Sequence, residues 1–138
     1  MKQALIDFRE KVLAAPAVAA IVARRMYPNY FPEGTPFPAI TYANTSAIRL
    51  ISFDGPIGYT TARLSVGAWA DTYADAETLA DAVRKSVNGF RGTFGSTFFQ
   101  AIKCENNLDT FGEGADQEAS SPGVHRVILD FAVSFNEP

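Results

Sequence analysis

Apolar and polar residues alternate along residues 60–70 and 124–136 of the chain. A period of two with one polar face is typical of a half-buried strand in an antiparallel sheet. The apolar faces of these two predicted strands are formed by Ala62, Leu64, Val66, Ala68 and Ala70, and by His125, Val127, Leu129, Phe131, Val133 and Phe135. Residues 39–43 predict a third strand. Residues 97–106 predict a fourth, one face of which is formed by Phe98, Gln100, Ile102 and Cys104.

Helical periodicity appears first at the beginning of the chain. Residues 2–15 predict a helix, because apolar positions recur there at spacings of three and four, namely Leu5, Phe8, Val12 and Ala15. Pro16 interrupts this helix, since proline has no N–H to donate. Pro16 also suits the first position of a second short helix over residues 17–25. We therefore expect a kinked or broken helical hairpin.

The strongest helical pattern covers residues 73–88. Its apolar stripe consists of Ala76, Leu79, Ala80, Val83 and Val87. Asp71 or Thr72 is suited to cap the first turn, and Asn88 followed by Gly89 is suited to end the helix. The glycine-rich residues 89–95 are then expected to form a flexible turn.

Three further segments connect these elements. Residues 26–38 contain four prolines, which exclude a helix or a central strand, and their aromatic residues indicate a stiff connector packed onto the domain. Residues 44–59 are too long for a tight hairpin and too apolar for a merely solvated loop, so we expect strand arms that extend past the sheet. Residues 107–123 combine glycines with acidic residues and predict a mobile acidic loop.

The order of these elements predicts a single α+β domain over residues 1–138. An antiparallel sheet of about four strands carries the N-terminal helical hairpin and one central helix on one face. The length is typical of one domain, and the hydrophobic fraction of 47% is sufficient for a core without disulfides or metals.

Composition and charge exclude several functional classes. One cysteine and one histidine exclude an intramolecular disulfide, a cysteine-rich zinc site and HExxH-type zinc chemistry. A pI near 5.1 argues against binding of nucleic acid by charge. No segment approaches the roughly 20 apolar residues of a membrane span, and the N-terminus does not resemble a signal peptide. We therefore expect a soluble, intracellular protein that neither crosses a membrane nor recognises a nucleic-acid sequence.

Candidate chemistry in the sequence is sparse. His125 has no neighbouring nucleophile or motif, and Cys104 lies in phase with apolar residues, as a small buried hydrophobe would. The spacing of Gly89, Gly92 and Gly95 lacks the lysine and hydroxyl of a phosphate-binding loop. Asp71 and Asp75 are explained by the start of a helix. We predict no catalytic, cofactor-binding or metal-binding residue, and hence not an enzyme.

Features that favour association are more frequent. Trp69 lies on the polar face of its strand beside Arg63, where either a second layer of helices buries it or it contacts a partner. The apolar part of the arm also indicates an association surface. The candidate interface residues are Ile48, Arg49, Leu50, Ile51, Phe53, Arg63 and Trp69.

The chain resembles the tail-completion, or tail-terminator, proteins of long-tailed bacteriophages and prophages. The resemblance is carried, in chain order, by Pro16-Ala17-Val18-Ala19-Ala20-Ile21-Val22, Arg25-Met26-Tyr27-Pro28, Pro36-Phe37-Pro38-Ala39-Ile40-Thr41-Tyr42 and Leu64-Ser65-Val66-Gly67-Ala68-Trp69-Ala70-Asp71, followed by an Ala-Glu-x-Leu-Ala type of helix. It covers most of the chain. Residues 107–123 match no pattern of the family.

The resemblance implies a structural virion protein, assembled in the bacterial cytoplasm and located at the head-proximal end of the tail. Such a protein caps the tail tube, usually as a hexameric ring, and ends tube polymerisation. Its partners are further copies of itself, the tail tube protein and the head-tail connector or closure protein, and it needs no cofactor. Alternatives are another neck component, such as a head-closure or tube-like subunit, and a small-ligand-binding domain around Tyr27, Phe31 and Trp69.

The acidic loop has two interpretations. In a ring around a DNA channel, Glu113, Asp116 and Glu118 would face the lumen and repel the passing phosphates. The same residues are equally consistent with an ordinary solvated surface.

Overall fold

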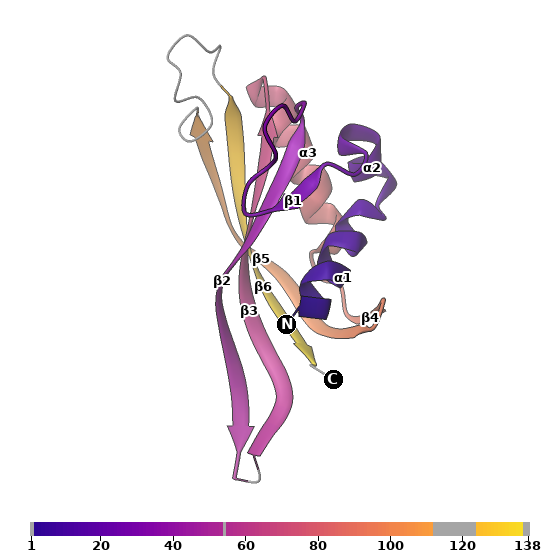
Figure 1. Cartoon of the computed structure of the whole chain (residues 1–138), viewed down its shortest axis with the longest axis vertical. Helices are drawn as coiled ribbons and strands as arrows, with labels where there is room; N and C mark the ends of the chain where they lie inside the picture. Colours follow the sequence, from indigo (N-terminus) through magenta and orange to yellow (C-terminus); the bar gives the residue numbers. More distant parts are fainter. Residues whose placement is uncertain (1, 54, 112–123, 137–138) are drawn as a thin grey trace.

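The computed structural model describes residues 2–53, 55–111 and 124–136. Their elements, in chain order, are α1 (Lys2–Leu13), α2 (Pro16–Val22), β1 (Met26–Pro28), β2 (Ala39–Ser52), β3 (Gly55–Ala70), α3 (Tyr73–Val87), β4 (Gly92–Phe94), β5 (Thr97–Phe111) and β6 (His125–Asn136). The strands form one twisted six-stranded sheet in the order β1-β2-β3-β6-β5-β4. The helices lie together on one side of this sheet, as Figure 1 shows. We call the opposite side the outer face.

The long strands β2, β3, β6 and β5 pair antiparallel with their neighbours in the sheet. Leu64 of β3 lies opposite Phe131 of β6, so the two apolar faces predicted from the alternation are the same face of the sheet. The side chains of both sets are buried apart from His125, which is half-buried. The α+β class and the two alternating strands are thus confirmed.

The helices cover this apolar face with their own stripes. Phe8 of α1 packs edge-on against Phe131, with ring centroids 5.8 Å apart. The predicted stripe of α3, from Ala76 to Val87, is fully buried. Aromatic pairs in this geometry contribute about 1 kcal/mol beyond the burial of their area. The helices therefore pack against one face of the sheet, as predicted.

The predicted helix boundaries are close to those observed. Pro16 occupies the first turn of α2, which ends at Val22 rather than at residue 25, since Ala23 adopts a positive φ of 56°. The hydroxyl of Thr72 caps α3 by accepting a hydrogen bond from the backbone N–H of Asp75 at 3.2 Å. Of the two predicted caps, Thr72 is thus the one used.

The sheet has more strands than the predicted four, and two of them are short. β1 lies within the proline-rich segment and pairs in parallel with β2 over Met26–Pro28. Because β1 is at the edge of the sheet, its proline removes no central hydrogen bond. β4 lies within the predicted flexible turn and pairs with the start of β5. Strands of three residues are too short to show a period, so the sequence pattern missed both.

β5 departs from its predicted phase and length. Phe99 and Ile102 are both buried, although they belong to opposite predicted faces. The register shifts between Phe99 and Ala101, and this bulge moves the following residues to the other face. β5 also continues to Phe111, so residues 107–111 belong to a strand and not to the predicted loop. Residues 112–123 of that loop lie outside the part of the chain that is described.

Candidate assembly surfaces

The most prominent surface feature is the arm formed by the far ends of β2 and β3. The last residue of β6, Asn136, lies opposite Tyr59, and among the described strands the residues of β3 before Tyr59 pair with β2 alone. The arm therefore projects from the body as a two-stranded ribbon (Figure 1). Of the residues predicted as strand arms, 44–49 pair with the part of β3 that also pairs with β6, and the projecting part begins after Arg49. An isolated two-stranded ribbon is only marginally stable in water, so contact with a partner would stabilise it.

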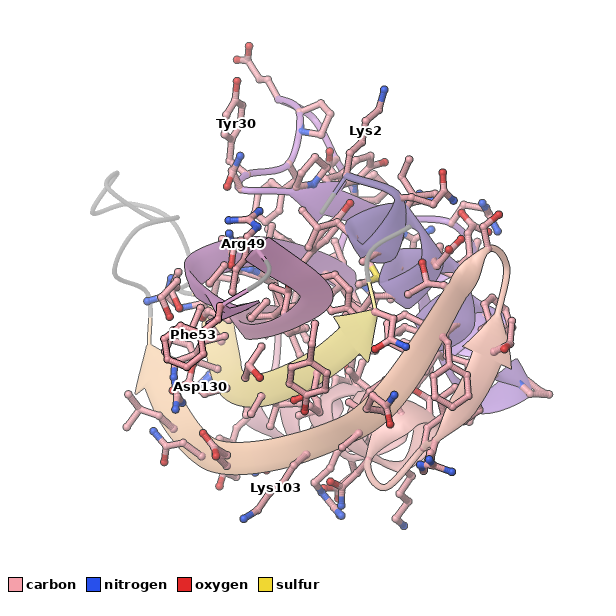
Figure 2. The ribbon with its side chains drawn as sticks, turned by 90° about the horizontal axis from the view of Figure 1, so that it is seen from below. Lys2, Tyr30, Arg49, Phe53, Lys103 and Asp130 are labelled. Carbon is pink, nitrogen blue, oxygen red and sulfur yellow. The ribbon has the colours of Figure 1, made fainter. Side chains whose placement is uncertain are left out.

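The arm exposes large apolar side chains. Ile48 is 66% exposed, and Phe53 in the turn between the two strands is fully exposed. Figure 2 shows Phe53 pointing away from the ribbon, with Arg49 on the same arm. Leu50 and Ile51 belong to β2, and their side chains lie outside the described part of the structure. Isolated exposed apolar residues are ordinary, but one at the base and one in the turn of the same projecting hairpin indicate association.

Beside the arm, the polar side chains of the outer face pair with one another. Arg63 of β3 reaches across β6 to the carboxylate of Glu105 on β5, with Nη1 and Oε1 2.6 Å apart. The amide of Asn106 donates a hydrogen bond to Asp130 at 3.4 Å. The predicted interface residue Arg63 thus already has a partner within its own subunit, and the ion pair braces three strands at the base of the arm.

Trp69 lies at the other end of the outer face, where the proline-rich connector covers it. Its indole N–H donates a hydrogen bond to the hydroxyl of Thr41 at 3.0 Å. The ring of Phe31 packs edge-on against it at 5.2 Å, and the guanidinium of Arg126 lies 4.8 Å from its centroid. Gly67 leaves room for this arrangement, since a Cβ there would lie 3.0 Å from the indole nitrogen.

The tryptophan is consequently 8% exposed in the single subunit. A second layer does bury it, but that layer is the connector rather than a helix. The expected packing of the connector onto the domain is confirmed. A contact of Trp69 itself with a partner stays a prediction, and it would require the connector to move.

The sparse candidate chemistry is not gathered into a site. Burial raises the pKa of the Cys104 thiol, which disfavours the nucleophilic thiolate. Cys104 lies opposite Phe131, six residues along β6 from His125, a separation of about 20 Å for an extended strand. The imidazole of His125 instead packs edge-on to Tyr73 at 6.1 Å. Within the described ranges, no three His, Cys, Asp or Glu side chains are grouped to hold a metal ion.

One polar contact that the sequence pattern did not reveal holds α1 against the β4–β5 turn. Asp7 is buried, and its Oδ2 accepts hydrogen bonds from the hydroxyl of Thr97 at 2.6 Å and the backbone N–H of Ser96 at 3.1 Å. The amide of Gln3 donates to its Oδ1 at 2.9 Å. The sequence did contain one indication that Asp7 is buried. Asp7 is three residues after Ala4 and directly before Phe8, so it lies on the side of the helix that faces the core.

Comparison with known proteins identifies the family. A family profile described as "Tail completion protein gp17" matches residues 8–134, which is nearly the whole chain. The chain belongs to this tail completion family. Its resemblance to these proteins, first suggested by short motifs, is therefore confirmed, and the protein is a structural component of a phage tail.

A solved structure shares the fold of this tail completion protein. It is a chain from the "Virion of native gene transfer agent (GTA) particle", with 14% sequence identity and a TM-score of 0.67. The alignment covers 95% of the present chain and 92% of the other. No curated protein sequence gives a significant match. Among the helices of the described ranges, none has the length and apolar character needed to cross a membrane.

Proposed function

We propose that this tail completion protein caps the head-proximal end of the tail tube and ends its polymerisation. Membership of the tail completion family and the fold shared with a chain of a virion particle support a structural role in the tail. The observation that carries the more specific proposal is the projecting arm with exposed Ile48 and Phe53. Such a ribbon adds a docking element to a subunit without altering the core.

The protein acts as a ring of identical copies, six in the arrangement implied by the family resemblance. A cyclic ring is built from heterologous contacts, in which each subunit uses two different surfaces. The arm supplies one surface, through Ile48, Arg49, Leu50, Ile51 and Phe53. The outer face near Arg63 and the connector over Trp69 supply the other. One side of the ring then meets the tube protein, and the other meets the connector or closure protein of the head.

Within the ring, Glu113, Asp116 and Glu118 line the channel and repel DNA during its passage. These residues lie outside the described part of the chain, and the proposal is supported by their charge alone. A chain with a net charge of -3 has little electrostatic affinity for a polyanion.

Two other functions compete with this one. A head-closure or tube-like subunit would also be small and ring-forming, but it would not stop the growth of a tube. A small-ligand-binding domain would need space around Tyr27, Phe31 and Trp69. The rings of Phe31 and Trp69 contact each other directly, and this contact disfavours a ligand between them.

Polymerisation of purified tail tube protein tests the proposal. Adding the wild-type protein should shorten the tubes in electron micrographs and leave a ring at one end. The double variant Ile48→Ser/Phe53→Ser should lose this effect while unfolding at the same urea concentration as the wild type. Ile6→Ser is a matched control, because Ile6 is 41% exposed but lies on α1, away from the arm. Tubes of unchanged length with wild-type protein would overturn the capping role, and a double variant that still caps would exclude the arm.

A further inference from the structure

We infer that neighbouring copies join edge to edge, so that the outer end of β2 in one subunit pairs with the outer end of β5 in the next. This inference rests on the proposed ring, and it assigns the second surface of the ring contact to the edge of β5 in place of the outer face near Arg63 and Trp69. The sheet ends in a different strand on each side, and each of those terminal strands, β1 and β4, is only three residues long. The strands behind them therefore form most of the two edges.

β2 offers the first of these edges. β1 pairs with β2 only from Ile40 to Tyr42, and no strand of the described chain pairs with β2 on that side from Ala43 onward. A bulge between Asn44 and Ser46 interrupts the edge at its base. Residues 46–52 then form the outer strand of the arm, in which a second register shift lies between Arg49 and Ile51. Unpaired backbone N–H and C=O groups in such a strand are a template for a further strand.

β5 offers the second edge. β4 pairs only with Thr97–Phe99, and the chain after α3 covers the next part of the strand. There the side chain of Asn88 accepts a hydrogen bond from the N–H of Cys104 at 2.9 Å, and the N–H of Gly89 donates to Ile102 at 2.7 Å. Beyond a second bulge, between Cys104 and Asn106, residues 106–111 pair with β6 alone among the described strands.

The side chains on the two edges complement each other. Ile48 lies opposite Thr61, and Leu108 lies opposite Ile128, which places both aliphatic side chains on the outer face of the sheet. Leu108 is 51% exposed and Ile48 is 66% exposed. When the two edges pair, these residues become cross-strand neighbours and shield each other from water. Aliphatic pairs across a strand junction stabilise it.

The strand directions also agree. Because β2 is antiparallel to β3, β3 to β6 and β6 to β5, a β5 strand placed beside the β2 strand of a similarly oriented copy is antiparallel to it. The alternation of the sheet thus continues from one subunit to the next.

The two edges belong to different strands and lie at opposite ends of the long axis of the molecule (Figure 1). A contact between them is therefore heterologous, and its repetition gives a closed ring when the rotation between neighbouring copies closes, as the proposed ring requires. Disulfide cross-linking measures this contact directly, because residues paired across antiparallel strands have Cβ atoms about 4.5–5.5 Å apart, close to the separation in a disulfide.

The experiment uses full-length protein carrying Cys104→Ser and one new cysteine per copy. Copies with Ser46→Cys or Ile48→Cys are mixed with copies of different tag length that carry Asn106→Cys or Leu108→Cys, and all four positions lie on the outer face. Rings capping tail tubes are then oxidised mildly. We expect at least one mixed pair to form a heterodimer in high yield, with no dimer from either variant alone. Ile6→Cys mixed with Leu108→Cys is the negative control.

Each outcome separates this inference from the proposed function. The edge-to-edge contact is overturned if rings form without a mixed cross-link. It is also overturned if copies carrying Ile48→Cys cross-link only to each other or only to the tube protein. In each of these cases the capping role still stands. Absence of rings at the tube ends, with all variants folded by circular dichroism, overturns the capping ring and this contact together.

Discussion

The carboxylate of Asp7 on α1 lies 2.6 Å from the hydroxyl of Thr97, at the start of β5 and ninety residues further along the chain. The same carboxylate also accepts the N–H of Ser96, so the first helix is attached to the turn between β4 and β5. A buried carboxylate is stable only where such donors replace water. This contact therefore holds α1 against the start of β5.

Replacing Asp7 with alanine is expected to lower the free energy of unfolding by about 3 kcal/mol, because buried donors on Ser96 and Thr97 lose their acceptor. Urea denaturation followed by circular dichroism measures the change. Asp81→Ala is the matched control, since Asp81 is exposed and its contact with Arg84 is a surface ion pair at 3.5 Å. The control should change stability by less than about 0.5 kcal/mol. Equal effects of the two substitutions would show that the Asp7 contact does not stabilise the fold.

Gly95→Ala is expected to destabilise the protein more than Gly34→Ala. Both glycines have positive φ, 64° and 84° respectively, so both substitutions carry the strain of a left-handed residue, about 1 kcal/mol. A Cβ at Gly95 would in addition overlap the carboxylate of Asp7, whereas a Cβ at Gly34 has no atom within 4 Å. The difference between the two midpoints of thermal unfolding isolates this overlap. If the two midpoints agree, the turn at Gly95 does not approach the Asp7 carboxylate of α1 as closely as described.

Phe31→Ala should expose the side chain of Trp69, the single tryptophan of the chain. We expect its fluorescence emission to shift to longer wavelength, because water replaces the Phe31 ring that packs against it. Tyr30→Ala alters the same connector at a residue that is 77% exposed, and it should leave the emission unchanged. An unshifted spectrum in the Phe31 variant would mean that the connector does not cover the tryptophan.

Tyr42 is expected to make the protein sensitive to alkaline pH. Burial raises the pKa of its hydroxyl above the ordinary value of 10.0; nearby Arg9 opposes this rise, and Glu10 adds to it. Because the folded state holds the proton more tightly, this contribution to stability is complete below about pH 10 and declines as the pH rises through the folded pKa. Tyr42→Phe should flatten the decline in urea titrations between pH 9 and 11 (roughly the range in which tyrosines ionise). Tyr30→Phe should leave the slope unaltered, and a slope that Tyr42→Phe also leaves unaltered would contradict the prediction.

Reversing the acidic residues of the proposed channel should separate assembly from DNA delivery. The triple variant Glu113→Lys/Asp116→Lys/Glu118→Lys is expected to form rings and capped tails of normal length. Passage of DNA should slow, because the new cations attract phosphates. Infectivity and the rate of DNA ejection measure the effect. Normal infectivity would assign these residues to a solvated surface instead.

The sequence alone determined the elements whose pattern is long enough to be unambiguous. The alternation from Ala62 to Ala70 and from Val127 to Phe135 predicted the two central strands and their buried face, because burial of one face imposes a period of two. The stripe of α3 was equally readable from its helical period. The length and apolar content of residues 44–59 indicated strands that continue past a tight hairpin.

Only the tertiary structure decided the features that depend on partners distant in the chain. β1 and β4 exist because β2 and β5 supply their hydrogen bonds, which no local pattern of three residues encodes. The bulge after Phe99 reverses the faces of β5, and the connector rather than a helix covers Trp69. The burial of Asp7 could not be predicted, because its donors lie about 90 residues further along the chain. Local periodicity thus specified which faces are buried, and long-range pairing decided which strands are neighbours in the sheet.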